Sequence, residues 1–258
     1  MSDPVKSFAE FVVIVRRLRV ECPWDNEQTH DSIRAMLLEE AYEVMESIED
    51  GNMLELRKEL GDILLHVVMH AVIAEETKTF SLHEVIEGES KKLIHRHPHV
   101  FGDVEAKSAE QVTMNWERLK LQETGRTSIL DGVPKTMPAL QRAQRLQQKA
   151  SSVGFDWSAI DDVWKKVEEE LAELRTVRAE DAAKEKIQDE FGDVLFSLVN
   201  FARFLKINPE DALRGTIEKF ISRFQYIEDA ASKQGRTLDG MTLVEMDALW
   251  DQAKQQTT

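Results

Sequence analysis

The sequence predicts an all-α fold built from two tandem, duplicated helical domains. Only 11 glycines and 6 prolines occur in 258 residues, and the long stretches between them are rich in strong helix formers. Apolar residues recur three and four positions apart, as at Leu195, Leu198, Val199 and Ala202, and we find no convincing alternating strand pattern. Four sequence blocks of the first half return in the same order in the second half.

The helical spacing predicts ten helices, five in each half of the chain. The first five cover 6–20, 27–49, 52–77, 81–94 and 108–123, and the second five cover 138–152, 159–178, 181–205, 208–233 and 242–256. Between the two sets, residues 125–134 are rich in turn formers and fall near the middle of the chain. We expect an N-terminal domain at 1–128, a linker at 129–137 and a C-terminal domain at 138–258.

The composition limits the classes of function. Lysine and arginine number 33 against 48 aspartates and glutamates, a net charge of −15, which disfavours nonspecific binding to nucleic acid or an anionic membrane. The longest aliphatic run near the start, residues 11–15, is too short for a membrane span. Cys22, the one cysteine, allows no internal disulfide and fits a reducing compartment. We expect a soluble, cytoplasmic protein without direct nucleic-acid or membrane binding.

The repeat is carried by acidic, basic and aromatic residues. The acidic segment 39–43 corresponds to 169–173, and 59–62 corresponds to 190–193, at offsets of 130 and 131. Lys92 and Arg96 correspond to Lys219 and Arg223 at an offset of 127, and Trp116 corresponds to Trp250 at an offset of 134. The conserved order and the small gaps indicate a duplicated domain.

The repeated acids can form a cation site. Residues three and four apart share one face of a helix, so Glu40 lies beside Glu43, and Glu59 lies beside Asp62. An antiparallel hairpin of the two helices would bring both faces together in each half. Like charges this close repel unless they are solvated, protonated or bridged by a cation. Carboxylate oxygens suit Mg²⁺, Mn²⁺ or Ca²⁺.

A solvated helix face is the ordinary explanation of an acidic cluster, but two features favour a metal site. The acids are embedded among apolar residues in both halves. Gly61 and Gly192 also lie between two of the acids inside helices, where glycine costs about 1 kcal/mol relative to alanine. The repeated glycine suggests the close approach of another helix or of a ligand.

A metal held only by carboxylates suggests a phosphate substrate, and basic residues of the second half could bind one. Lys219 and Arg223 share a helical face, and arginine grips phosphate through two hydrogen bonds. Lys186 precedes Glu190 by one turn, which is also the spacing of an ordinary ion pair. From spacing alone, Trp250 fits core packing better than stacking on a base.

The repeated acidic pattern, E-E-x-x-E followed by E-x-G-D, resembles the MazG family of nucleoside triphosphate pyrophosphohydrolases. The likeness extends to Cys22–Asp25, His97–Gly102 and Glu245–Trp250, and so covers nearly the whole chain. The resemblance implies all-α domains that pair into four-helix-bundle-like homodimers with Mg²⁺ at the acids. It also implies hydrolysis of a nucleoside or deoxynucleoside triphosphate, such as ATP, to the monophosphate and pyrophosphate, with Mn²⁺ as a possible substitute metal.

The resemblance also assigns roles to residues of the second half. It makes Glu170, Glu173, Glu190 and Asp193 the metal ligands, and it lets Glu169 hold a second ion or orient the attacking water. It places Lys186, Lys219 and Arg223 on the triphosphate and Trp250 at the nucleoside end. Lysine and arginine there would offset charge on the departing pyrophosphate.

The first half offers a second, weaker site from the corresponding residues Glu39, Glu40, Glu43, Glu59, Asp62, Lys92, Arg96 and Trp116. One turn before Glu59 stands Glu55, where the second half has Lys186, a charge reversal at an expected phosphate contact. We therefore expect the C-terminal domain to carry most of the hydrolysis.

Three other interpretations fit less well. A di-iron site needs Glu-x-x-His from two helices, and only Glu27 with His30 has that spacing. His95, His97 and His99 alternate around a proline, which is weak evidence for zinc and better explained by capping or packing. A helical scaffold or binding protein would be expected to have lost the acids, but both sets are complete.

Overall fold

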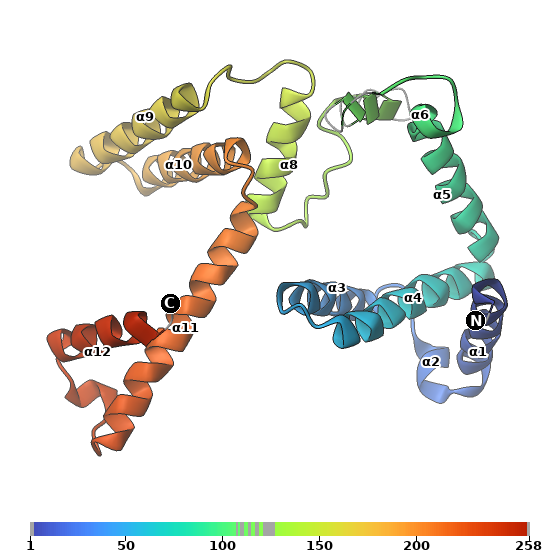
Figure 1. Cartoon of the computed structure of the whole chain (residues 1–258), viewed down its shortest axis with the longest axis horizontal. Coiled ribbons are helices and arrows are strands. Elements are labelled where there is room, and N and C mark those ends of the chain that lie inside the picture. The colour runs from blue at the N-terminus through green and yellow to red at the C-terminus, as the bar shows by residue number, and fades with distance from the viewer. Residues whose placement is uncertain are drawn as a thin grey trace. The chain divides into compact units, whose positions relative to one another are not determined.

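The computed structural model of the chain describes residues 3–106, 108, 111–112, 115–116, 119–120 and 127–256. All regular structure in these residues is helical, which confirms the predicted all-α class. Contacts divide the chain into two compact units, Met1–Val112 and Thr113–Thr258 (Figure 1). The division expected from the sequence, with domains at 1–128 and 138–258 and a linker at 129–137, stays a prediction.

The first unit contains the helices α1 (Pro4–Glu21), α2 (Pro23–Glu27), α3 (Arg34–Glu49), α4 (Met53–Glu76), α5 (Leu82–Arg96) and α6 (Pro98–Phe101). Helices α3 and α4 form a hairpin, and α1 packs against α4. The core lies between α1 and the second half of α4, where Val15 and Val68 are fully buried. Apolar residues on the acid-bearing parts of α3 and α4, such as Leu38, Leu60 and Leu64, are exposed.

The second unit contains α8 (Ala139–Ser151), α9 (Ile160–Ala179), α10 (Lys184–Phe204), α11 (Pro209–Lys233), a short 3₁₀ turn at Leu238–Gly240 and α12 (Leu243–Gln256). Helices α9 and α10 form the hairpin that corresponds to α3 and α4. Helix α8 packs against α10 and α11, and α12 packs against α11. The side chains of Val163, Val167, Val194 and Val199 are buried around the α9–α10 hairpin.

The duplication extends to the turns of the two hairpins. Gly51 and Asp181, 130 positions apart, both adopt left-handed backbone conformations, with φ of 65° and 50°. The next amide in each turn closes the same bond: Asn52 N donates to Ser47 O at 2.9 Å, and Ala182 N donates to Val177 O at 3.1 Å. This is the helix-ending arrangement in which a left-handed residue satisfies free carbonyls. The second turn is one residue longer, because α4 begins at Met53 and α10 begins 131 positions later, at Lys184.

The prediction of one helix over 27–49 is wrong, because residues 28–33 separate α2 from α3. The buried Arg19 guanidinium donates to the carbonyl oxygens of Asp25 and Gln28. Ser32 N donates to Thr29 Oγ1 at 3.1 Å, and Thr29 N donates to Ser32 Oγ at 2.8 Å. These side-chain bonds compete with helical hydrogen bonds and hold the segment as a loop.

The other predicted helices that the structure describes agree with it to within three residues at each end. The short helices α2 and α6 were not predicted separately, and most of the predicted helix 108–123 lies outside the described residues. Among the helices of the described part, none combines the length and apolar character needed to cross a membrane.

The expectation of a close approach at Gly61 and Gly192 is not met within the described chain. A methyl group added at either glycine would meet no other side chain or helix within 4 Å. Leu60, Leu64, Phe191 and Leu195 beside them are also exposed. The acid-bearing stretch of each hairpin therefore has an open, partly apolar face.

Candidate active site

The α9–α10 hairpin brings together carboxylates that lie 20 and more residues apart in sequence. One oxygen each of Glu170 on α9 and of Glu190 and Asp193 on α10 lies within 4.8 Å of the other two. Glu170 is buried, whereas Asp193 is exposed. The arrangement follows from helix spacing, because Glu190 and Asp193 are one turn apart on the face that meets α9. Three hard oxygen donors therefore converge.

Glu173, the fourth predicted ligand, stands one turn after Glu170, and its carboxyl is repelled by the charges of Glu170 and Glu190. Partial desolvation, followed by the charges of Glu170 and Glu190, raises the pKa of Glu173. A raised pKa means that the ionised form is disfavoured by its neighbours. A bound cation would relieve this repulsion.

Lys166 adds a positive charge that we did not predict from the sequence. Its Nζ atom lies 2.7 Å from Glu169 Oε1 and 2.7 Å from Glu170 Oε1. Both hydrogen bonds raise the pKa of Lys166, so the side chain remains an ammonium at neutral pH. A sequence signal existed, because Lys166 precedes the two glutamates by three and four positions.

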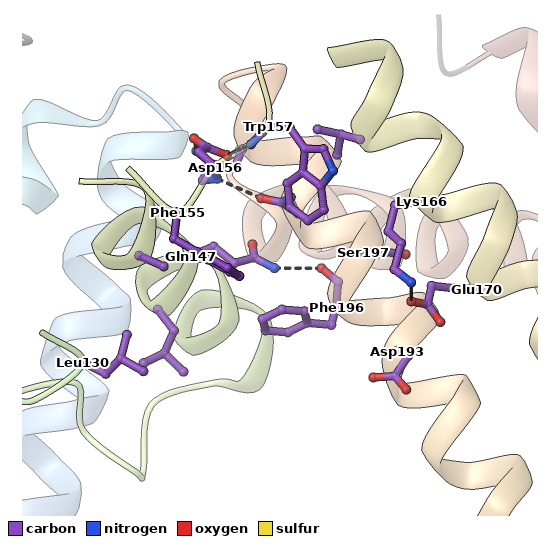
Figure 2. Close-up of a pocket in the computed structure, with 15 residues that line it drawn as sticks. Leu130, Gln147, Phe155, Asp156, Trp157, Lys166, Glu170, Asp193, Phe196 and Ser197 are labelled. Atoms are coloured by element: carbon purple, nitrogen blue, oxygen red, sulfur yellow. Dashed lines mark hydrogen bonds and ion pairs between the residues drawn. The ribbon is translucent and has the colours of Figure 1, made fainter. Parts of the chain in front are cut away.

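A cavity of about 400 Å³ adjoins these charges. Its lining is mostly apolar, with Phe155, Trp157 and Phe196 among the contributing side chains. In Figure 2, the Lys166–Glu170 ion pair and Asp193 lie on one side of the view, and Leu130 and Phe155 lie on the other. The cavity has the size and character of a small-molecule pocket, with Lys166, Glu170 and Asp193 at an ionic end and the ion pair of Asp156 and Arg203 elsewhere in its lining.

Two amides in the cavity wall have fixed orientations. The Gln147 amide nitrogen donates to Phe196 O at 2.8 Å, which leaves Oε1 buried without a hydrogen-bond partner. Asn200 Oδ1 accepts from Arg203 Nε at 2.9 Å, which leaves its amide nitrogen as the remaining donor. If either amide flipped, the Gln147 oxygen would face the Phe196 oxygen, or the Asn200 nitrogen would face Arg203 Nε. The wall therefore contains one oriented acceptor and one oriented donor, neither of which we predicted.

The predicted phosphate and nucleoside contacts do not line this cavity. Lys186 is exposed on the first turns of α10. Lys219 and Arg223 lie on α11, where the Arg223 guanidinium lies 5.6 Å from the centroid of the Trp250 ring. Trp250 also packs against Phe220, with ring centroids 5.3 Å apart. Lys219, Arg223 and Trp250 thus share the α11–α12 part of the unit, and their roles stay predictions.

The first unit also brings three carboxylates together, with Glu43 in place of Asp62, the counterpart of Asp193. One oxygen each of Glu40, Glu43 and Glu59 lies within 4.8 Å of the other two. Desolvation, followed by the charges of Asp62, Glu43 and Glu39, raises the pKa of Glu40. A smaller cavity of about 210 Å³ beside them is lined mainly by acids, including Glu55. The position that corresponds to Lys166 holds Met36, so this set lacks the lysine found in the second unit.

The basic and aromatic residues predicted for a site in the first half do not line the 210 Å³ cavity. Lys92, on α5, pairs with Glu89, and Arg96 is buried at the end of the same helix. Trp116 falls in the second unit, where the Lys120 ammonium lies 3.5 Å from its ring centroid. Their assignment to a second site stays a prediction.

The histidines of the described residues take no part in either carboxylate set. His97 is the residue that ends α5, and its Nδ1 lies 2.7 Å from Leu93 O. His97 is thus the C-terminal cap of α5, whereas the expected capping or packing role of His95 and His99 stays a prediction. Neither set has the donors of a di-iron site.

Comparison with known proteins identifies the family. A sequence model described as the MazG nucleotide pyrophosphohydrolase domain matches residues 28–101 and 160–227, the segments that contain the two acid-bearing hairpins. The chain belongs to the MazG family. It is therefore an enzyme, a nucleotide pyrophosphohydrolase, and the two matches confirm the tandem duplication.

Relatives of the MazG family cover almost the entire chain. The chain is 43% identical over 251 residues to the nucleoside triphosphate pyrophosphohydrolase/pyrophosphatase MazG of Thermotoga maritima, covering 96% of this chain and 95% of that protein. It is 39% identical over 255 residues to the nucleoside triphosphate pyrophosphohydrolase of Escherichia coli K12, covering 95% and 96%. It is also 46% identical over 252 residues to the uncharacterized protein YabN of Bacillus subtilis, of which it spans 52%.

Proposed function

We propose that this MazG protein hydrolyses nucleoside and deoxynucleoside triphosphates to the monophosphate and pyrophosphate, with Mg²⁺, mainly in its second unit. The names of the Thermotoga and Escherichia relatives support the substrate class. The observation that carries the assignment to the second unit is the 400 Å³ cavity beside Glu170 and Asp193. Water adds across the anhydride bond between the α- and β-phosphates, which breaks to give the monophosphate and pyrophosphate.

The carboxylates of the second unit fit a hard divalent cation. Three oxygens from different residues lie within 4.8 Å, and Glu173 adds a fourth carboxylate nearby. Oxygen-only donors favour Mg²⁺, with Mn²⁺ as a substitute. When bound, Mg²⁺ supplies positive charge that polarises the phosphates and makes water more acidic. Glu169 is suitably placed beside Glu170 to orient the attacking water or to hold a second ion.

The cavity suits the nucleoside part of the substrate. Its aromatic side chains offer planar apolar surfaces to a base, while the ionic end lies next to the proposed metal ligands. Gln147 Oε1 can accept from an N–H group on the base edge, and the Asn200 amide nitrogen can donate to a ring nitrogen or carbonyl. A buried acceptor without a partner costs free energy, which a bound base would recover.

The first unit lacks these features and is proposed to act mainly in assembly or as a weaker site. Its 210 Å³ cavity is lined by five carboxylates, Glu43, Glu46, Asp50, Glu55 and Glu59. A triphosphate entering this cavity would meet charges of its own sign. We propose that Lys186, Lys219 and Arg223 of the second half contact the triphosphate, and that Glu55 excludes the same contact in the first half.

The exposed apolar residues support a homodimer. Leu60, Leu64, Phe191 and Leu195 lie on the two acid-bearing hairpins and are 39–55% exposed. Burial of such faces against equivalent hairpins would produce four-helix packing, the arrangement that the family resemblance implies. Size measurements by light scattering test this point directly.

Product analysis tests the proposed reaction. The purified protein is incubated with each nucleoside and deoxynucleoside triphosphate, with and without Mg²⁺, and the products are separated by ion-exchange chromatography. We expect the monophosphate and pyrophosphate in equal amounts, and only with the metal. The diphosphate and inorganic phosphate would show that a different bond is cleaved, and no turnover of any nucleotide would support a binding protein.

A further inference from the structure

Lys166 occupies an unusual position for a lysine next to a proposed metal site. Its ammonium lies 2.7 Å from oxygens of both Glu169 and Glu170, and Glu170 belongs to the converging carboxylate set. The Glu170 side chain is only 9% exposed, so this ion pair is better shielded from water than a surface pair. Lys166 also lines the cavity proposed for the nucleoside. The Lys166 side chain thus contacts both the carboxylates and the cavity proposed for the nucleoside.

The first unit shows what the same carboxylate arrangement looks like without this lysine. Met36 stands at the corresponding position, 130 residues earlier, and cannot neutralise Glu39 or Glu40. Glu40, Glu43 and Glu59 nevertheless converge within the same 4.8 Å, although Glu43 stands here in place of the counterpart of Asp193. A lysine is therefore not required to bring three carboxylates together, and its presence in the second unit calls for another explanation.

We propose that Lys166 is an exchangeable counter-ion, which rests on Glu169 and Glu170 in the free enzyme and moves to the nucleotide phosphates when metal and nucleotide bind. This inference rests on the proposed function. An ammonium and a divalent cation repel each other and compete for the same Glu170 oxygen. The lysine stem is flexible, and its side chain is 36% exposed, so the charge can leave the carboxylates without being buried alone.

The exchange couples the two binding events. In the free enzyme, Lys166 weakens divalent-cation binding because the ion pair must first be broken. A bound triphosphate offers the ammonium new oxygen partners, which frees Glu170 for the metal. Because binding linkage is reciprocal, the metal must then strengthen nucleotide binding by the same factor. Lys166 is a positioning residue that makes the enzyme take up metal and nucleotide together.

Replacement of Lys166 by methionine, the residue of the first unit, tests the exchange. Mg²⁺ binding to the full-length protein is measured by calorimetry, in a Glu40→Gln background that weakens the first carboxylate set. Without nucleotide, we expect Lys166→Met to bind Mg²⁺ about three- to tenfold more tightly, which is the effect of losing one or two partly exposed ion pairs. The α,β-methylene analogue of ATP cannot be cleaved between the α- and β-phosphates. In the presence of Mg²⁺, it should bind to Lys166→Met about tenfold more weakly than to the parent protein.

Two variants serve as controls. Lys165→Met removes the neighbouring lysine, whose Nζ lies 2.8 Å from Asp162 Oδ1 on the same helix, and should leave both affinities unchanged. Lys166→Arg keeps the positive charge and should retain the weak Mg²⁺ binding of the parent protein. Thermal unfolding of each variant without ligands separates a change in affinity from a change in stability.

The outcomes distinguish this inference from the proposed function. If the parent protein binds Mg²⁺ and Lys166→Met binds it with equal or lower affinity, Lys166 is no counter-ion, although the metal site stands. If Mg²⁺ and the nucleotide analogue bind independently in the parent protein, the coupling is also absent. If Mg²⁺ binds neither protein, with or without the analogue, the proposed metal site and the inference both fail.

Discussion

At the scale of single residues, the repeat predicted the carboxylates but not the groups around them. Glu170, Glu190 and Asp193 could be found because helix spacing fixes which acids share a face and the hairpin brings both faces together. Lys166 was not predicted, because the repeat does not mark it: its counterpart in the first half is Met36. Gln147 could not be found at all, since its role depends on a partner, Phe196 O, 49 residues away.

We predict that Gln147→Met lowers kcat/KM about fivefold, by unequal amounts for different bases, because the variant loses an oriented acceptor worth about 1 kcal/mol. Steady-state kinetics with the four ribonucleoside triphosphates measure the effect. Gln148→Met, at the exposed neighbouring position, is the matched control and should change nothing. An equal loss for all four substrates would indicate that Gln147 only supports the cavity wall.

The raised pKa values of Glu40, Glu59 and Glu173 predict how stability changes with pH. A carboxyl whose pKa is higher in the folded than in the unfolded chain destabilises the fold once ionised. The contribution of these three carboxyls to stability without metal should therefore fall as pH rises above about 4.5, through the raised pKa values. Mg²⁺ should stabilise the protein more at pH 8 than at pH 5. Thermal unfolding with and without Mg²⁺ tests this, and an equal Mg²⁺ effect at both pH values would contradict it.

At the scale of helices, periodicity predicted the long elements well and the short ones poorly. The hairpins α3–α4 and α9–α10 have strong apolar spacing, and their predicted outer bounds hold except at the start of α3. There, the Arg19 guanidinium donates to the carbonyl oxygens of Asp25, inside α2, and of Gln28, the residue that follows α2. No local pattern reveals a bond formed by an arginine of a different helix, so tertiary contacts decided this boundary.

The open helical position of Gly192 leads to a prediction at the same scale. Alanine should raise the stability of the α9–α10 hairpin by about 1 kcal/mol, because the added methyl meets nothing in the described chain. The same methyl should weaken the proposed dimer about tenfold if Gly192 faces the second subunit, as the repeated glycine suggests. Urea unfolding and sedimentation measure the two effects, with Gly88→Ala on α5 as a control for helix propensity alone. An unchanged dimer affinity would show that Gly192 does not lie in the interface.

At the scale of the whole molecule, the duplication has produced two units with equivalent carboxylates and different surroundings. The first set adjoins a small acidic cavity and has Met36 at the position of Lys166. The second set adjoins a larger apolar cavity that contains Gln147 and Lys166. Sequence alone indicated the asymmetry through Glu55 and Lys186, but the cavity arises from packing among α8, α9, α10 and the segment before α9. A packed volume of this kind has no signature in sequence spacing.

The most direct measurement compares matched variants of the two carboxylate sets. Glu170→Gln and Glu40→Gln each remove one negative charge at equivalent positions, and pyrophosphate release from a nucleoside triphosphate is followed at saturating Mg²⁺. We predict that Glu170→Gln reduces kcat by at least about 100-fold, because a proposed metal ligand is lost. Glu40→Gln should retain most of the activity. Full activity in Glu170→Gln together with its loss in Glu40→Gln would place catalysis in the first unit and contradict the account.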